Sequence, residues 1–471
     1  MKSVKANFIW NSAYQLLLIV IPLITTPYLS RVLGPEPIGV YSYSFSVANY
    51  FVLFATLGMG SYGVRVIAAA SDDKTKRSEV FWGAYVCQVF VSIVIVLAYG
   101  IYTVFLNPLG GVVVALAWMP WVLSAGLDVS WLFFGVEDFK LPTIRSAFTK
   151  IISVIAIFLF VKSSADLSVY CFLIAISYLL NSVLIWPFVR RIVDFYKPSS
   201  KEIFQHFWPN VRLFAPVVAV SVYSSLNKIM LGTISGMDQA GFYEYSEKLS
   251  KMPLSLVTAL GTVMLPRMTS SLTEGNRKQA LGMLSRSMFV MQGAAMAMAF
   301  GIAAIAPVFT IVFFGTGFEP CMYIMPILSV VIPLIAASNV IGVQYMLPNY
   351  SDRAYTVSVI FGATANVLVN LLLLPSFGAI GAAVATVAAE ATVLCFQCWV
   401  VRAELPLGVY FRSSIPFILI GCLMFLLVRS IPTIFVISGS LLLIVQIATG
   451  GLFYLLLSGL YLKLKRTILR I

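Results

Sequence analysis

Long apolar runs recur along the whole chain, and they constrain its fold more than any other feature. Residues 8–31 form the first run, and comparable runs follow to residue 460 with short polar breaks between them. A helix needs about 20 apolar residues to cross a hydrocarbon core about 30 Å thick, whereas an outer-membrane strand alternates apolar and polar residues. The runs are continuous, so they predict an all-α polytopic membrane protein.

Composition agrees with this prediction, since 60% of the residues are hydrophobic and 10% are charged. A soluble domain usually carries about 25% charged residues. The spacing of the runs predicts about fourteen transmembrane helices. We place them at roughly 8–31, 38–66, 80–104, 112–134, 142–161, 167–189, 208–233, 241–265, 286–313, 322–347, 355–374, 379–401, 414–431 and 433–460.

The first run follows Lys2 and Lys5, as a secretory signal would. It is longer than the apolar region of a signal peptide and lacks a small-x-small cleavage pattern, so we expect it to remain as the first span. The basic residues, 31 against 18 acidic ones, gather in alternate loops such as 72–77, 190–201 and 463–470. This is the positive-inside pattern, which predicts that both termini are cytoplasmic and gives no reason to expect a nucleic-acid partner.

Cysteine and histidine usage argues against a metal or redox site. The six cysteines are scattered in apolar spans, and His206 is the single histidine. Cys395 and Cys398 form a CxxC, but no second cysteine pair accompanies it. Small apolar packing is the ordinary role of such cysteines.

An internal duplication is visible at two places. A shift of 202 places GVYSYS at 39–44 on GFYEYS at 241–246 and Arg65 on Arg267, and a shift of 213 aligns 139–148 with 352–361. Six spans separate equivalent positions, which predicts two parallel-repeat six-helix lobes. We assign 1–190 to the N-terminal lobe, 191–207 to a cytoplasmic linker, 208–402 to the C-terminal lobe, and 403–471 to two additional helices with a basic tail.

Ionisable side chains inside these spans are the candidate site residues, because each costs on the order of 2.5–3.5 kcal/mol at the bilayer centre. The cations exceed the acids, which suits a substrate that carries phosphate. The candidate substrate-binding cations are Arg65, Lys150, Lys228, Lys248, Lys251 and Arg267. The candidate ion-coupling acids are Asp128, Glu390, Glu244 and Glu247, with a proton or sodium as the coupling ion and no other cofactor.

Most of the candidates have a simpler interpretation, and Lys228 is the one for which it is least persuasive. Glu244 with Lys248, and Glu247 with Lys251, are i,i+4 pairs that by themselves make a helix easier to insert. The matching positions of the first repeat, 42, 45, 46 and 49, are polar at three of four, which favours a face that lines water in both lobes. Lys150 can extend its side chain so that the ammonium reaches the membrane surface. Arg65 and Arg267 can anchor helix ends there. Asp128 and Glu390 can form helix–helix hydrogen bonds.

Several stretches resemble the bacterial polysaccharide flippases, the Wzx-type branch of the multidrug/oligosaccharidyl-lipid/polysaccharide exporter superfamily. They are "NFIWNSAYQLLLIVIPLITTPYLSRVLGPEPIGVYSYS", "LGMGSYGVR", "WLFFGVEDFK", "VYSSLNKIMLG", "GFYEYSEKLSK" and "VMLPRM". Arg65, Lys228, Lys248 and Arg267 occupy motif positions. Asn227 departs from the pattern, because an acidic residue often stands beside the lysine there, and this departure puts ion coupling in doubt.

The resemblance implies a multi-pass transporter of the bacterial cytoplasmic membrane. It implies that the protein turns an undecaprenyl-diphosphate-linked oligosaccharide from the inner to the outer leaflet, for capsule, O-antigen or exopolysaccharide, by alternating access through a cationic central cavity. The implied partners are this lipid-linked oligosaccharide, membrane lipids, and a polysaccharide polymerase with its assembly proteins.

Two related transporters and one enzyme class remain as alternatives. A drug or cation antiporter of the same superfamily should have a cavity dominated by carboxylates, and a lipid II-type flippase would share the basic cavity. A polymerase or glycosyltransferase needs acid/base groups and a sizeable loop. No outer loop predicted here is long enough, so we do not expect an enzyme.

Overall fold

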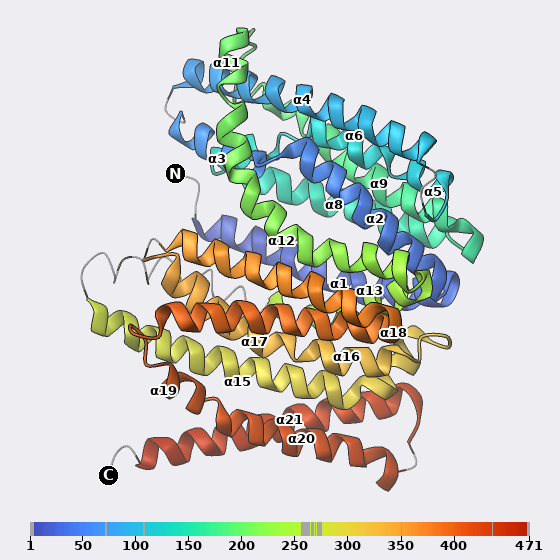
Figure 1. Ribbon diagram of the computed structural model, residues 1–471, viewed down its shortest axis with the longest axis vertical. Helices are drawn as coiled ribbons and strands as arrows, with labels where there is room; N and C mark the ends of the chain where they lie inside the picture. The colour runs from blue at the N-terminus through green and yellow to red at the C-terminus, as the bar shows by residue number, and fades with distance from the viewer. Residues whose placement is uncertain are drawn as a thin grey trace. The chain divides into compact units, whose positions relative to one another are not determined.

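The computed structural model describes the backbone of residues 4–70, 73–106, 109–255, 276–349, 351–435 and 437–468, together with residues 264, 268 and 270. The regular structure of this part of the chain is helical (Figure 1). Within it, ten helical stretches are long and apolar enough to cross a membrane, and Leu17–Leu33 is a shorter apolar helix. The prediction of an all-α polytopic membrane protein is therefore confirmed.

The chain forms two compact units, residues 1–233 and 234–471, which we describe separately. This division falls after the seventh predicted span, whereas the predicted linker between the lobes ends at residue 207. The assignment of lobes came from a sequence duplication, which compactness does not test, so it stays a prediction.

The first unit contains helices α1 to α12. Their bounds are α1 Val4–Leu33, α2 Pro35–Thr56, α3 Met59–Ala69, α4 Lys74–Phe105, α5 Val112–Ala117, α6 Met119–Leu127, α7 Ser130–Gly135, α8 Lys140–Phe160, α9 Leu167–Val183, α10 Trp186–Val189, α11 Ser200–Phe204 and α12 Phe207–Ile234. A single 3-10 turn, η1 Ser164–Asp166, precedes α9. Two aromatic-rich cores hold the unit together, one around Trp118 and Trp121 and the other around Phe81 and Trp131.

Three spans of this unit that were predicted as single helices are interrupted, including 167–189, which breaks between α9 and α10. The span at 38–66 breaks between α2 and α3, where Leu57 has a φ of 48°. Gly58 is needed at this break because a Cβ there would lie 2.6 Å from the backbone oxygen of Asn210 on α12. The span at 112–134 divides into α5, α6 and α7, with Pro120 in the first turn of α6 and Asp128 at its C-terminal end. Hydropathy detects the apolar run but not such local breaks.

The second unit contains helices α13 to α21. Their bounds are α13 Met237–Lys251, α15 Arg277–Phe309, α16 Cys321–Ser329, α17 Val331–Ser338, α18 Asp352–Val401, α19 Leu407–Arg412, α20 Ile415–Ile434 and α21 Gly439–Ile468. Two π-helical segments, η2 Thr310–Phe314 and η3 Asn339–Met346, follow α15 and α17. The second half of the predicted span 241–265 lies mostly outside the described residues.

Helix α18 has two arms that match the predicted spans 355–374 and 379–401. They meet at Gly378, whose φ of 50° is left-handed and so favours glycine. The Gln239 side chain of α13 accepts a hydrogen bond from the Ala379 amide at 3.1 Å, which ties α13 to this kink. The arms fold closely together, because a Cβ on Gly381 would lie 2.8 Å from the Leu373 carbonyl oxygen.

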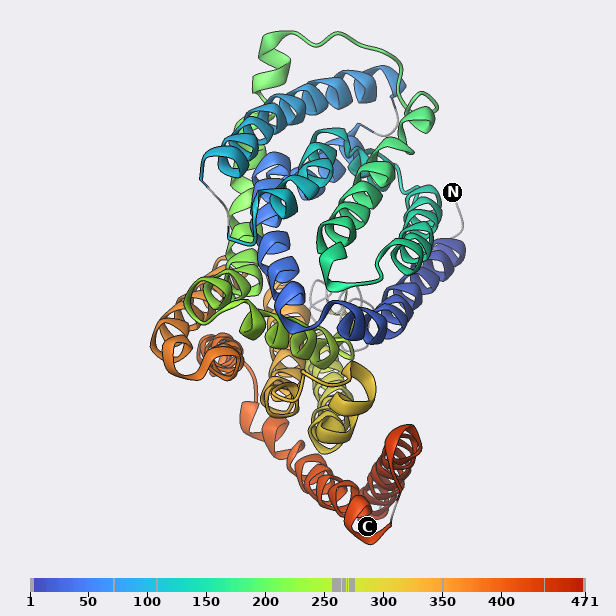
Figure 2. The same cartoon turned by 90° about the vertical axis from the view of Figure 1, so that its right-hand side faces the viewer.

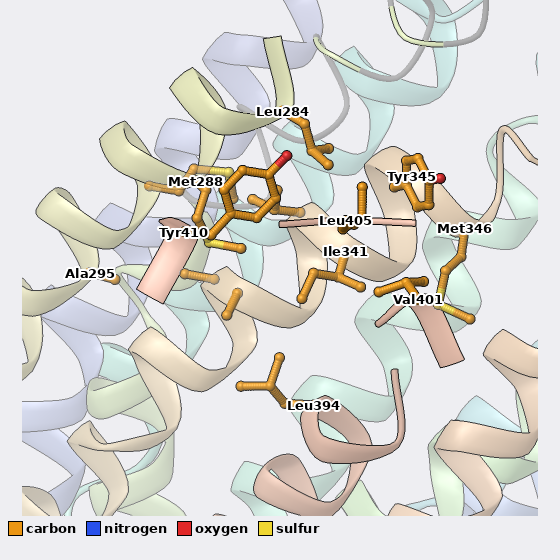
Figure 3. Close-up of a cluster of buried hydrophobic side chains, with 14 of the residues drawn as sticks. Leu284, Met288, Ala295, Ile341, Tyr345, Met346, Leu394, Val401, Leu405 and Tyr410 are labelled. Carbon is orange, nitrogen blue, oxygen red and sulfur yellow. The ribbon is translucent and has the colours of Figure 1, made fainter. Parts of the chain in front are cut away.

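The core of the second unit gathers side chains from α15, η3, α18 and α19 (Figure 3). Met288, Ile341, Tyr345, Leu394 and Tyr410 are all buried there. Helices α20 and α21, drawn in red at the C-terminal end, lie side by side (Figure 2). They pack on α15 through a smaller cluster that includes Phe417, Met424 and Tyr454.

Candidate functional site

One face of α13 carries a buried row of hydrogen-bonded polar side chains. Tyr243, Glu247 and Lys251 are spaced four residues apart, so they follow one another along the same side of the helix. The Lys251 ammonium lies 2.8 Å from Glu247 Oε1, and the Tyr243 hydroxyl donates to the same oxygen at 3.3 Å. The Glu247 side chain is only 9% exposed, so the ion pair is largely shielded from water.

The second arm of α18 completes this group. Thr386 Oγ1 lies 2.8 Å from the Tyr243 hydroxyl, and Glu390 follows one turn later on α18. Glu390 is 6% exposed and interacts electrostatically with Lys251. We call Tyr243, Glu247, Lys251, Thr386 and Glu390 the α13–α18 cluster. It places two carboxyl groups around one ammonium inside an apolar bundle.

The structure thus confirms the predicted Glu247–Lys251 pair and brings Glu390 into its neighbourhood. Glu244 and Lys248, the other predicted pair, are both half-buried on α13. Their pairing stays a prediction.

The equivalent stretch of the first unit is polar and buried as well. Ser42 and Ser46 on α2 are buried, and the Ser46 hydroxyl donates to the Ser42 carbonyl oxygen at 2.7 Å. Farther along α2, Asn49 Nδ2 donates to Ser225 Oγ at 3.3 Å, and the Tyr50 hydroxyl donates to the Ser221 carbonyl oxygen at 3.3 Å. Polar contacts therefore join α2 to α12, the helix that carries Lys228.

Asp128 lies at the break between α6 and α7 and has a local role there. Its Oδ1 atom accepts a hydrogen bond from the Ser130 amide at 2.9 Å and another from the Ser130 hydroxyl. Ser130 Oγ in turn accepts from Arg145 Nη2 on α8 at 3.0 Å. Asp128 therefore helps to fix the start of α7 and the position of a buried arginine.

Arg145 is a buried cation that the sequence prediction did not single out. It is 7% exposed in the middle of a unit made largely of apolar helices. The signal was present, because Arg145 lies in the same apolar span as Lys150, which was singled out. Gln88 was missed too: its side chain bonds to the Trp131 indole at 3.0 Å and to the Ala125 carbonyl oxygen at 2.6 Å.

The remaining predicted cations are not brought together by the described contacts. Arg65 is exposed on α3, whereas Lys150 on α8 and Lys228 on α12 are half-buried. Arg267 lies outside the described residues. In the described part of the chain, no group of three or more His, Cys, Asp and Glu side chains is arranged to hold a metal ion.

The fold is the one found in solved membrane transporters. The structure matches the "Lipid II flippase MurJ, inward closed conformation" with a TM-score of 0.78 and 14% identity, over 97% of this chain and 99% of that one. It also matches an inward-facing multidrug resistance MATE family transporter of the MOP superfamily with a TM-score of 0.61 and 13% identity, over 84% and 94% of the two chains. Identities this low show the fold alone.

The sequence comparison is more specific. Residues 4–272 match the family described as "Polysaccharide biosynthesis protein", and the chain belongs to that family. It is 25% identical to the "Putative O-antigen transporter" of Escherichia coli (strain K12) over 404 residues, 85% of this chain and 97% of that protein. It is 24% identical to the "Probable low-salt glycan biosynthesis flippase Agl15" of Haloferax volcanii over 208 residues, 43% of each chain. The chain is thus a transporter-family member and not an enzyme.

Proposed function

We propose that this protein translocates an undecaprenyl-diphosphate-linked oligosaccharide from the inner to the outer leaflet of the bacterial cytoplasmic membrane, for the biosynthesis of a surface polysaccharide. Membership of the polysaccharide biosynthesis family and similarity to the O-antigen transporter and glycan flippase named above support this substrate class. The observation that carries the proposal is the α13–α18 cluster, because a buried ion pair with a further carboxyl group is costly in an apolar bundle, and ionisable groups inside membrane spans mark substrate or ion pathways.

The proposal gives the cations the task of receiving the diphosphate. Lysine binds phosphate as a point charge and arginine as a two-pronged donor. Arg65, Lys150, Lys228, Lys248, Lys251 and Arg267 are the proposed set. Moving two negative charges outward across a potential of 100 mV, negative inside, releases roughly 4–5 kcal/mol, so the membrane potential favours export of a diphosphate.

Alternating access of two repeat-related lobes, with both termini cytoplasmic, is the proposed mechanism. Glu390 is the preferred candidate for ion coupling, because it is buried beside the Glu247–Lys251 pair and Glu247 already shares its oxygen with two donors. A proton or sodium ion on Glu390 would change the charge that Lys251 experiences. Partnership with a polymerase and its assembly proteins follows from the same role, since the delivered units must be joined outside.

Deletion of the gene in a strain with an intact sugar-assembly pathway tests the substrate class. We expect undecaprenyl-linked repeat units to accumulate, and we expect a periplasmic glycosidase or ligase not to reach them because they remain in the inner leaflet. Normal surface polysaccharide without a trapped intermediate would exclude the proposal. Accumulation of lipid II instead would favour the lipid II-type alternative.

A further inference from the structure

The segment between α10 and α12 carries an exposed basic and aromatic surface that the transport mechanism does not use. Three aromatic side chains in it or directly after it are largely exposed: Phe195 at 82%, Phe204 at 63% and Trp208, in the first turn of α12, at 67%. Arg190, Lys197 and Lys201 are exposed in the same segment. We call these six residues the linker surface. Exposed apolar surface that is rimmed by polar residues marks a site of contact with a protein or a membrane.

The backbone beneath this surface is fixed to the start of α4. Arg77 donates to the Ile192 carbonyl oxygen at 2.8 Å, and the Trp82 indole donates to the Asp194 carbonyl oxygen at 2.9 Å. The Asp194 amide donates to Ser78 Oγ at 2.9 Å. Helix α11 also lies beside α4 (Figure 1), where a Cβ on Gly83 would come within 3.0 Å of the Glu202 carbonyl oxygen. The segment therefore presents its side chains from a defined support.

Both acidic residues of the segment are occupied within the unit. Asp194 pairs with Lys74 at 2.7 Å. Glu202 accepts from the Ser199 amide at 2.6 Å, from the Ser199 hydroxyl at 2.9 Å and from the Tyr196 hydroxyl at 3.0 Å. These donors lower the pKa of Glu202, which keeps it an anion bound to its own neighbours. The charge left to face a partner is positive.

We infer that the linker surface lies on the anionic inner leaflet of the membrane, with its aromatic rings at the level of the headgroups and its bases paired with lipid phosphates. The segment joins α10 and α12, which belong to predicted membrane spans, so it cannot move far from the bilayer surface. Aromatic side chains concentrate at membrane–water interfaces, and bases near an anionic leaflet are attracted to it. Short loops rich in lysine and arginine lie on the cytoplasmic side.

The inferred role is an anchor that holds the cytoplasmic end of the first unit at a fixed depth. The segment is hydrogen-bonded to α4, so contact with headgroups would set the height of α4 and of the start of α12 together. A nucleic acid or a soluble protein partner fits less well, because the aromatic rings would then be withdrawn from a membrane that already adjoins them.

Hydrogen–deuterium exchange of the intact protein in nanodiscs tests this inference. The amides of residues 195–205 are compared in phosphatidylcholine alone and in phosphatidylcholine with one-third phosphatidylglycerol. We expect exchange about tenfold slower with the anionic lipid, and we expect high salt to remove part of that difference. Equal exchange of the unaltered protein in the two lipids would overturn the inference.

Two sets of variants separate the rings from the charges. Phe195→Ser with Phe204→Ser should raise exchange in both lipids, and Lys197→Gln with Lys201→Gln should abolish the difference between the lipids. Phe435→Ser is the matched control, because Phe435 is 55% exposed directly after α20, at the end of that helix opposite its predicted cytoplasmic end. It should leave exchange at 195–205 unchanged. If the amides of residues 195–205 stay protected in both sets of variants, the inference would also be overturned. Exchange of the α4 amides reports whether each variant is folded.

Discussion

Lys251 lies 2.8 Å from Glu247 on the same face of α13, and Glu247 shares that oxygen with the Tyr243 hydroxyl. Tyr243 also bonds to Thr386, so the ion pair is tied to the second arm of α18. A pair that only made the helix easier to insert would need no such bridge. The Tyr243 hydroxyl therefore connects the Glu247–Lys251 pair of α13 to α18.

Removing Lys251 alone should destabilise the protein. Lys251→Met leaves the buried Glu247 carboxylate without its strongest donor, and we expect a loss of about 1–3 kcal/mol in the free energy of unfolding. Glu247→Gln in the same background should restore most of this loss, because the neutral amide no longer requires a cation. Thermal unfolding of the single and double variants in nanodiscs measures both effects.

A translocation assay on the same Lys251 and Glu247 variants separates the structural role of Lys251 from its role in transport. If Lys251 receives the diphosphate, the double variant should be stable yet inactive in a translocation assay. Lys162→Gln, which changes an exposed lysine of the first unit, is the control and should keep full activity. Full translocation by the double variant would reduce Lys251 to a structural partner of Glu247.

Gly63 and Gly60 make a matched pair in α3. A Cβ on Gly63 would lie 2.6 Å from the Trp131 ring, whereas one on Gly60 would meet nothing within 4 Å. We expect Gly63→Ala to lower the free energy of unfolding by about 1–3 kcal/mol through overpacking. Gly60→Ala should change it by less than about 1 kcal/mol. Equal melting temperatures for the two variants would show that Trp131 on α7 can move away from α3 without lowering the free energy of unfolding.

His206 should make stability depend on pH. It is buried just before α12 with Nδ1 2.6 Å from the Tyr62 hydroxyl, and burial lowers its pKa from the ordinary 6.5. The folded protein therefore keeps His206 neutral, while the unfolded segment binds a proton below about pH 6.5. The contribution of His206 is present above that value and is lost as pH falls toward the lowered pKa.

The measurement is the melting temperature between pH 5 and pH 8, compared with His206→Gln. The unaltered protein should lose stability on the acidic side more steeply than the variant does. Lys201→Gln, a nearby exposed change, should leave the slope as it is. Identical slopes for the unaltered protein and His206→Gln would contradict the assigned effect of burial.

Glu390→Gln should uncouple transport from the ion gradient. The amide keeps the size of the side chain and cannot carry a proton, so we expect a folded protein whose translocation no longer responds to an imposed proton or sodium gradient. Asp166→Asn is the control. It removes an exposed carboxyl group that directly precedes the predicted span 167–189, and the variant should retain the response. An unchanged response in Glu390→Gln would return Glu390 to a helix-packing role.

The sequence predicted the helical class and most of the spans, because hydropathy reports directly on the cost of placing side chains in a bilayer. It also predicted the Glu247–Lys251 pair, since four-residue spacing on a helix is a local property. The division at Gly378 was predicted as a boundary between two spans, and the left-handed φ of that glycine is its physical cause.

What the sequence left open depends on contacts between distant residues. Arg145 was missed because its partner Ser130 lies 15 residues earlier on α7, and only the folded unit brings the two within 3.0 Å. The need for glycine at position 58 depends on the approach of Asn210 from α12, which no local pattern encodes. The role of Thr386 in joining α18 to Tyr243 has the same origin.

Translocation by the purified protein tests the central claim most directly. The protein is reconstituted into liposomes whose inner leaflet carries a fluorescent undecaprenyl-diphosphate-linked oligosaccharide, and an added glycosidase reports its arrival in the outer leaflet under an inside-negative potential. We predict release that depends on the protein, grows with the potential and is lost in the stable Lys251→Met, Glu247→Gln variant. Release no faster than in protein-free liposomes would contradict the proposed function.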